Sequence, residues 1–137
     1  MTAKSWSQKG YKPLPEPIEQ VGKQVLDAAF AVHRQLGPGF LEKFYEEALC
    51  IELAARRIPF VRQKTISVHY RDHLLGKQRL DLLVADLVVV EVKAVEEMLP
   101  LFEAQVISYL TATGLRLGYL INFNTVLLKH GIRRIVR

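Results

Sequence analysis

Two carboxylates and one ammonium group stand close together in the segment RLDLLVADLVVVEVK at residues 79–93. Asp81, Glu91 and Lys93 lie inside or at the edge of an apolar block that is expected to be buried in a sheet. Burying charge without partners costs roughly several kcal/mol or shifts the protonation state. The position of these three residues therefore marks them as candidates for a chemical role.

The length of the turn inside this segment decides whether the two acids meet. With a two-residue loop, Asp81 would face Val90, and Glu91 would point to the other face of the sheet. With a three-residue loop at residues 85–87, Asp81 would pair with Glu91. Lys93 lies two residues beyond Glu91 on the same strand and therefore shares its face.

A pairing of Asp81 with Glu91 would favour a divalent cation, because neighbouring carboxylates repel each other unless one is protonated or a cation lies between them. Mg²⁺, or Mn²⁺ in its place, suits a small oxygen site that keeps open water positions. The cation could orient and polarise a phosphodiester and lower the pKa of a water molecule. Lys93 could hold the attacking water or stabilise developing charge. The alternative is a structural or solvated ion pair, which is a common role for an ExK tripeptide at a strand edge.

The elements that must position these groups are read from the spacing of apolar residues. A period near 3.6 predicts helices, and extended patterns predict strands, with RDHLLG at residues 71–76 as a turn region. The order ααβββαββ predicts an α/β (α+β) domain with a mixed sheet flanked by helices. The predicted helices are 18–36, 40–57 and 101–113, and the predicted strands are 60–63 with 65–70, 79–84, 87–93, 115–123 and a last one within 125–137.

Length and composition describe an ordinary globular protein. The 137 residues fit a single domain, predicted at 16–137 after a flexible basic leader at 1–15. The formal net charge is +5, which is compatible with a phosphate-bearing partner. Cys50 is the only cysteine, so no intrachain disulfide can form. No apolar run is long enough to cross a membrane and no signal peptide is recognised, so a cytoplasmic location is expected.

The motif set resembles the PD-(D/E)xK nuclease superfamily. Asp81 matches the first acid of that pattern and EVK at residues 91–93 matches the second part, while Leu80 stands where the name has proline. Gln105 and Tyr109 resemble the QxxxY element of RecB-type members, and a restriction-endonuclease-like core is implied. The segment LGPGFLEKFYEEAL at 36–49 also matches the small bacterial and archaeal GxxExxY family, with Gly39, Glu42 and Tyr45 in the named spacing.

This resemblance implies roles for individual residues. Asp81 and Glu91 would be metal ligands, with the backbone carbonyl of Val92 as a third oxygen donor. Glu42 would complete the metal shell or bind a water held by the metal, and the alternative is an exposed acid near a helix N-terminus. Lys93 would act as an electrostatic catalyst.

Four further residues have both a functional and a structural interpretation. Gln105 and Tyr109 could orient the substrate backbone or Lys93, or Tyr109 could simply face the core. His33 could approach the metal, as in RecB-type nucleases, or serve as a core or capping histidine. Tyr45 could line the cleft or pack as an aromatic.

We therefore predict a Mg²⁺-dependent or Mn²⁺-dependent nuclease acting on DNA, with RNA as the alternative substrate. A catalytically silent module that binds nucleic acid or protein is the rival interpretation. A metal-stabilised subunit of a larger repair or defence assembly is a third. A homodimer joined by the apolar final strands is also predicted, because nucleic-acid interfaces commonly bury on the order of 1,000 Å² of protein surface.

Overall fold

The computed structural model describes residues 13–137, so most of the predicted leader lies outside the described residues. The helices and strands follow one another in the predicted order. They are α2 (Glu16–Leu36), α3 (Glu42–Ala55), β1 (Phe60–Tyr70), β2 (His73–Val84), β3 (Val88–Lys93), α4 (Pro100–Thr113), β4 (Leu117–Asn122), the short 3₁₀ helix η1 (Leu128–Gly131) and β5 (Ile132–Val136). No helix in the described range is both long and apolar enough to span a membrane.

Proline and glycine set the ends of two helices. Pro100 opens α4, where its missing N–H is no loss, and Gly114 ends it with a φ of 75° that favours glycine. Helix α2 ends at Gly37, whose N–H donates to the carbonyl of His33 at 2.8 Å. These boundaries are those that the sequence predicts, within one or two residues.

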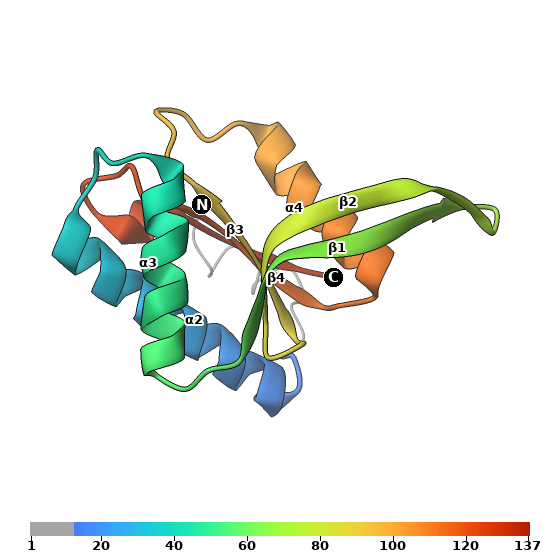
Figure 1. The fold of residues 1–137 in the computed structure, drawn as a ribbon, viewed down its shortest axis with the longest axis horizontal. Coiled ribbons are helices and arrows are strands. Elements are labelled where there is room, and N and C mark those ends of the chain that lie inside the picture. The colour runs from blue at the N-terminus through green and yellow to red at the C-terminus, as the bar shows by residue number, and fades with distance from the viewer. Residues whose placement is uncertain (1–12) are drawn as a thin grey trace.

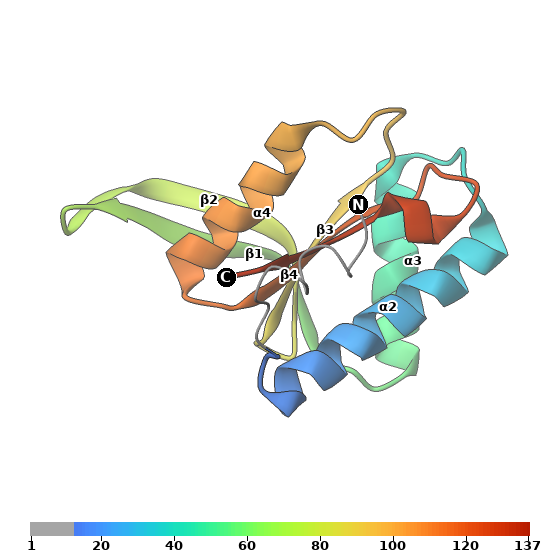
Figure 2. The ribbon, with the colours of Figure 1, turned by 180° about the vertical axis from the view of Figure 1, so that it is seen from behind.

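The five strands form one mixed sheet in the order β1-β2-β3-β4-β5, with only β3 and β4 parallel. Helices α2 and α3 cover one face of this sheet and α4 covers the other (Figures 1 and 2). On the α2/α3 face, Val25 and Leu49 pack with Val90 in the larger core cluster. On the other face, Leu110 packs with Val89. The predicted mixed sheet flanked by helices is confirmed.

Two local predictions are wrong. Residues 71–76 do not form a long turn, because β2 already begins at His73 and pairs with Tyr70. The β1–β2 hairpin is therefore longer than predicted. The TVLLK segment at 125–129 is not a strand, and its last residues belong to η1. Side-chain burial explains this difference, since Leu128 is buried in the core while Val126 and Leu127 are exposed, which is not a strand pattern.

The turn between β2 and β3 settles the register of the two acids. Val84 pairs with Val88, so the loop holds three residues, as the second alternative requires. Ala85 and Asp86 both have left-handed backbone angles, with φ of 52° and 57°. The N–H of Leu87 closes the turn by donating to the Val84 carbonyl at 3.0 Å.

Candidate active site

Asp81 and Glu91 meet where the ladder between β2 and β3 ends. The last paired residues are Leu82 and Val90, and the two acids occupy the next position. Their side chains replace ladder bonds there. The N–H of Asp81 donates to Glu91 Oε1 at 2.9 Å, and the N–H of Val92 donates to Asp81 Oδ2 at 2.9 Å. The two carboxylates are thus fixed to each other's strand.

Strand β2 turns out of the sheet at this point. Leu80 and Leu83 pack in the same cluster against α4, although residues three apart on a regular strand face opposite sides. The change of face therefore falls at Asp81. In β1, Arg62 pairs with Leu82 and Lys64 pairs with Leu80, so Gln63 is the residue left opposite Asp81. Gln63 has a left-handed φ of 55°. A non-glycine residue in this conformation inside a strand stores strain, which is often retained at functional sites.

Burial makes the charged forms of both acids unfavourable. Burial, followed by the neighbouring Asp81 carboxylate, raises the pKa of Glu91 to about 7. Burial also raises the pKa of Asp81, while its hydrogen bond from the Val92 backbone opposes the rise. Glu91 as a whole residue is only 5% exposed. Near neutral pH Glu91 is therefore partly protonated, and a cation beside the two carboxylates would relieve their repulsion.

Lys93 lies close enough to lower the pKa of both acids. It is two residues beyond Glu91 on β3, and its ammonium nitrogen lies 4.5 Å from the centroid of the Phe102 ring. A cation over an aromatic face is attracted by the ring quadrupole. Phe102 of α4 can therefore hold the Lys93 ammonium beside the carboxylates.

Glu42, the first residue of α3, lies near the same cluster. Burial raises its pKa, the Lys93 ammonium opposes the rise, and the Asp81 carboxylate adds to it. Within residues 13–137, however, no three side chains of the types His, Cys, Asp or Glu are close enough to form a metal-binding group. Glu42 is near the cluster without joining a preformed set of three ligands.

The comparison with protein families decides the assignment. The family model described as the PD-(D/E)XK nuclease superfamily matches residues 19–135, which is nearly the whole chain. The chain belongs to the PD-(D/E)XK nuclease superfamily. This match does not test the narrower GxxExxY assignment, which stays a prediction. The searches of curated proteins and of solved structures found no match.

The PD-(D/E)XK fold also places Tyr109 near the carboxylates. Tyr109 is buried on α4 with Leu80 and Val89, and burial, followed by Glu91 and then Asp81, raises its pKa to about 12. Tyr109 therefore stays protonated and packs as a core residue, and the Glu91 and Asp81 carboxylates act on its hydroxyl electrostatically. Gln105 lies one turn earlier on α4 and is half-buried.

Polar residues that the sequence pattern does not mark as functional link the superfamily site to α3. The Gln63 amide nitrogen lies 3.0 Å from Glu46 Oε2, and Gln63 is near enough to Asp81 to lower the pKa of that carboxyl. Arg62 pairs with Glu46 at 2.7 Å and with Glu47 at 2.7 Å. A chain of polar contacts thus runs from α3 through Gln63 to Asp81. Periodicity carries no signal for it, because Gln63 reads as an ordinary polar strand residue.

Three other residues have structural roles in this PD-(D/E)XK domain. The Tyr45 hydroxyl donates to the Gly37 carbonyl at 2.6 Å, and its ring stacks on Phe123 with centroids 4.9 Å apart. His33 Nε2 lies 2.8 Å from the carbonyl oxygen of Thr125, joining α2 to the loop after β4. Cys50 is buried, and burial raises its pKa to about 11, so its thiol is not activated.

Proposed function

We propose that this protein is a divalent-metal-dependent nuclease that hydrolyses phosphodiester bonds of DNA. The observation that carries the proposal is the pairing of Asp81 with Glu91 at the end of the β2–β3 ladder, with Lys93 beside them. Superfamily membership supports nuclease chemistry, and nucleases of this superfamily generally use divalent metals. RNA is the alternative substrate.

The residues present fit a hard cation such as Mg²⁺, or Mn²⁺ in its place. Asp81 and Glu91 supply carboxylate oxygens, and the carbonyl of Val92 is the proposed third donor. The raised pKa values of both acids favour a cation, because it would stabilise their charged forms. When bound, the metal supplies a positive charge that polarises the phosphodiester and eases deprotonation of water.

Lys93 is the proposed electrostatic catalyst. Its ammonium group, seated 4.5 Å from the centroid of the Phe102 ring, can orient the attacking water and stabilise charge on the phosphate oxygens. Glu42 is the proposed outer acid of the site, acting through a hydrogen-bonded water, as its place beside the cluster allows. Gln105 and Tyr109 are proposed to position the substrate backbone or Lys93. The GxxExxY assignment belongs to this proposal.

The second candidate is a catalytically silent module that binds nucleic acid or protein. It is favoured by one observation, the lack of three clustered ligand side chains within residues 13–137. Such a module would keep the fold and its surface without turnover.

A cleavage assay separates the two candidates. Labelled single-stranded, duplex and branched DNA, and RNA of the same sequences, are incubated with the protein in Mg²⁺, Mn²⁺ or EDTA. Cleavage with metal that disappears in Asp81→Asn and Lys93→Ala supports the nuclease. The matched controls are Asp86→Asn, an exposed acid of the same hairpin, and Lys23→Ala on α2. Cleavage that survives Asp81→Asn would refute the proposed site.

A further inference from the structure

The β1–β2 hairpin continues beyond the candidate site as a two-stranded ribbon. Residues 64–79, called the arm below, remain paired up to Tyr70 and His73. At about 3.3 Å per residue, each strand of the arm extends roughly 20 Å past Asp81. Figures 1 and 2 show the arm projecting away from the rest of the fold, beyond α4.

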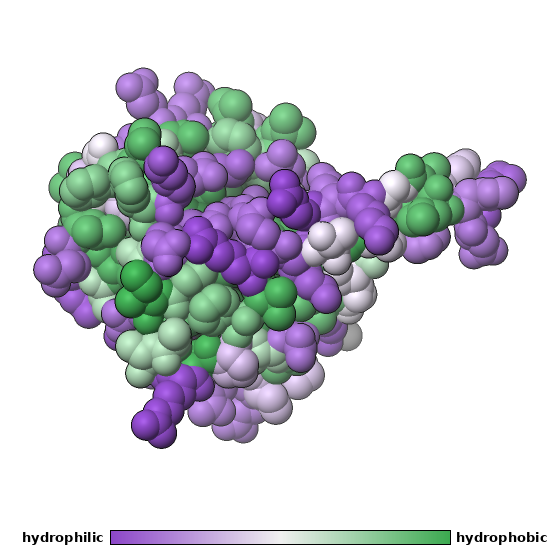
Figure 3. All heavy atoms as spheres, viewed as in Figure 1, coloured by the Kyte–Doolittle hydropathy of each residue, from purple (hydrophilic) through white to green (hydrophobic). Residues whose placement is uncertain are grey.

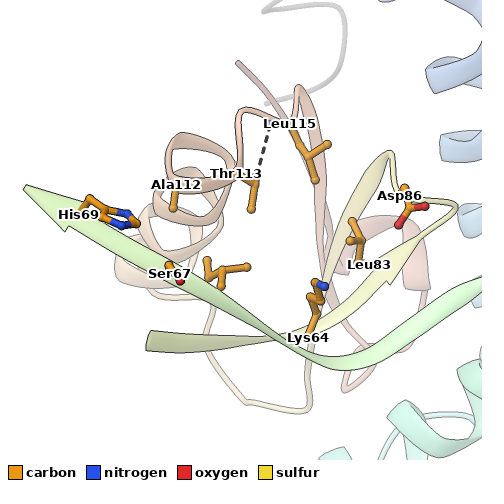
Figure 4. Close-up of a pocket in the computed structure, with 9 residues that line it drawn as sticks. Lys64, Ser67, His69, Leu83, Asp86, Ala112, Thr113 and Leu115 are labelled. Carbon is orange, nitrogen blue, oxygen red and sulfur yellow. Dashed lines mark hydrogen bonds between the residues drawn. The ribbon is translucent and has the colours of Figure 1, made fainter. Parts of the chain in front are cut away.

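One side of the arm is turned toward the protein. Ile66 packs with Leu110 of α4, which anchors the base of the arm. Beside it, a groove of about 410 Å³ separates β1 from the end of α4, with Lys64 on one wall and Thr113 on the other (Figure 4). Gln78 lines the neighbouring groove on this same side.

The opposite side of the arm is exposed and basic. Lys77 and Arg79 flank Gln78 on β2, so by strand alternation they project away from α4. The arm contains four Lys or Arg residues and only one acid; of the other two basic residues, Arg71 lies at the turn and Lys64 lines the groove on the α4 side. Within the described residues, none of these four forms an ion pair. Figure 3 shows hydrophilic surface extending from the middle of this face toward the arm.

We propose that the arm enters the major groove of duplex DNA and holds the DNA backbone over Asp81 and Glu91. This inference rests on the proposed nuclease function. A two-stranded β-ribbon fits the B-DNA major groove, which is about 12 Å wide. The deep, narrow major groove of duplex RNA does not admit it. Arg79 lies only two residues from Asp81, so a phosphate contact at Arg79 would bring the same backbone to the acids.

A second copy of the chain is the competing occupant. Tyr70, Leu74 and Leu75 near the tip are exposed and could pack against another protein surface. Two arms would, however, bring together like charges that repel each other. The basic face matches phosphates instead, because neutralising them releases counterions from the DNA.

Fluorescence anisotropy with a 24-base-pair labelled duplex in EDTA tests the proposal. The double variant Lys77→Gln/Arg79→Gln should bind about tenfold more weakly at 100 mM salt, and the slope of log K against log[salt] should fall by about 2. Arg71→Gln, in the exposed turn, is a second variant with a smaller expected loss. The control Lys23→Gln/Arg34→Gln removes the same charge from exposed positions on α2 and should bind like wild type.

Each outcome decides the matter. Wild-type affinity in the arm variants, or an equal loss in the α2 control, overturns the arm proposal. Tighter binding of duplex RNA or of single-stranded DNA than of duplex DNA would also overturn the arm proposal. So would a dimer, measured by light scattering, that the tip substitution Leu74→Asn/Leu75→Asn converts into a monomer while DNA binding stays intact. Arm-dependent duplex binding without cleavage in any metal would refute the proposed nuclease while supporting the arm.

Discussion

The backbone N–H of Asp81 donates to the carboxylate of Glu91 at 2.9 Å across the end of the β2–β3 ladder. The bond ties a candidate metal ligand into the hydrogen bonding of the sheet. A substitution of either acid therefore changes both the charge of the site and the pairing of two strands. Amide replacements are the suitable probes, because Gln and Asn keep an acceptor oxygen of the same reach.

The first prediction concerns pH. Glu91 has a pKa of about 7 in the folded protein against 4.5 ordinarily, so the native state binds more protons between these values. Without metal, the free energy of unfolding should therefore fall by about 3 kcal/mol as pH rises from 4.5 to 7. Urea unfolding in EDTA measures this, and Glu91→Gln should flatten the dependence. Equal slopes in the two proteins would contradict it.

The second prediction concerns metal binding and uses melting temperature. Mg²⁺ or Mn²⁺ should raise the melting temperature of the wild type, because a ligand of the native state stabilises it by mass action. Asp81→Asn should lose that rise, and Asp86→Asn should keep it. Lys93→Ala should keep most of the rise while cleavage falls by about 100-fold or more. A rise that persists in Asp81→Asn would place the metal elsewhere.

The third prediction tests Gln63 as a positioning residue for Asp81. Gln63→Gly keeps the left-handed backbone, which suits glycine, but removes the amide between Glu46 and Asp81. Cleavage should fall about tenfold with a small change in melting temperature. The exposed Gln35→Ala on α2 is the control. If Gln63→Gly cleaves like wild type, the polar chain from α3 has no part in catalysis.

The fourth prediction separates Tyr45 from the chemistry. Tyr45→Phe removes a bond to the Gly37 carbonyl at 2.6 Å and another from the Phe40 N–H at 3.1 Å. The variant should lose about 1 to 3 kcal/mol of stability. Below its melting transition, the cleavage rate should match that of the wild type. A cleavage rate below that of the wild type under conditions where Tyr45→Phe is fully folded would indicate that Tyr45 acts in the cleft.

Much of the fold is predictable because the spacing of apolar residues and the positions of proline and glycine indicate the same helix and strand boundaries. Pro100 and Gly114 bound α4 in both the sequence pattern and the structure. The alternation in β2 and β3 also limited the site to two registers. Choosing between them needed the geometry of the turn, since Ala85 and Asp86 carry no strong preference for left-handed angles.

The remainder depends on tertiary contacts that local patterns do not encode. Gln63 adopts its backbone angle because β1 must follow β2 out of the sheet, and a strand pattern does not show that bend. The sequence pattern underestimates the length of the arm because Leu74 and Leu75 lie in a ribbon that is exposed on both strands. Apolar residues there have no buried face that would set a period of two.

The three-residue turn at 85–87 also constrains how the gene can change. Gaining or losing one codon there would leave the hydrophobic content of β2 and β3 intact, yet it would shift Asp81 to the opposite face from Glu91. Natural relatives that keep the paired acids should therefore show insertions and deletions at the arm tip near Arg71, and a fixed length at this turn. A family-wide alignment can be read for this pattern directly, because length variation and loss of the acid pair should occur together.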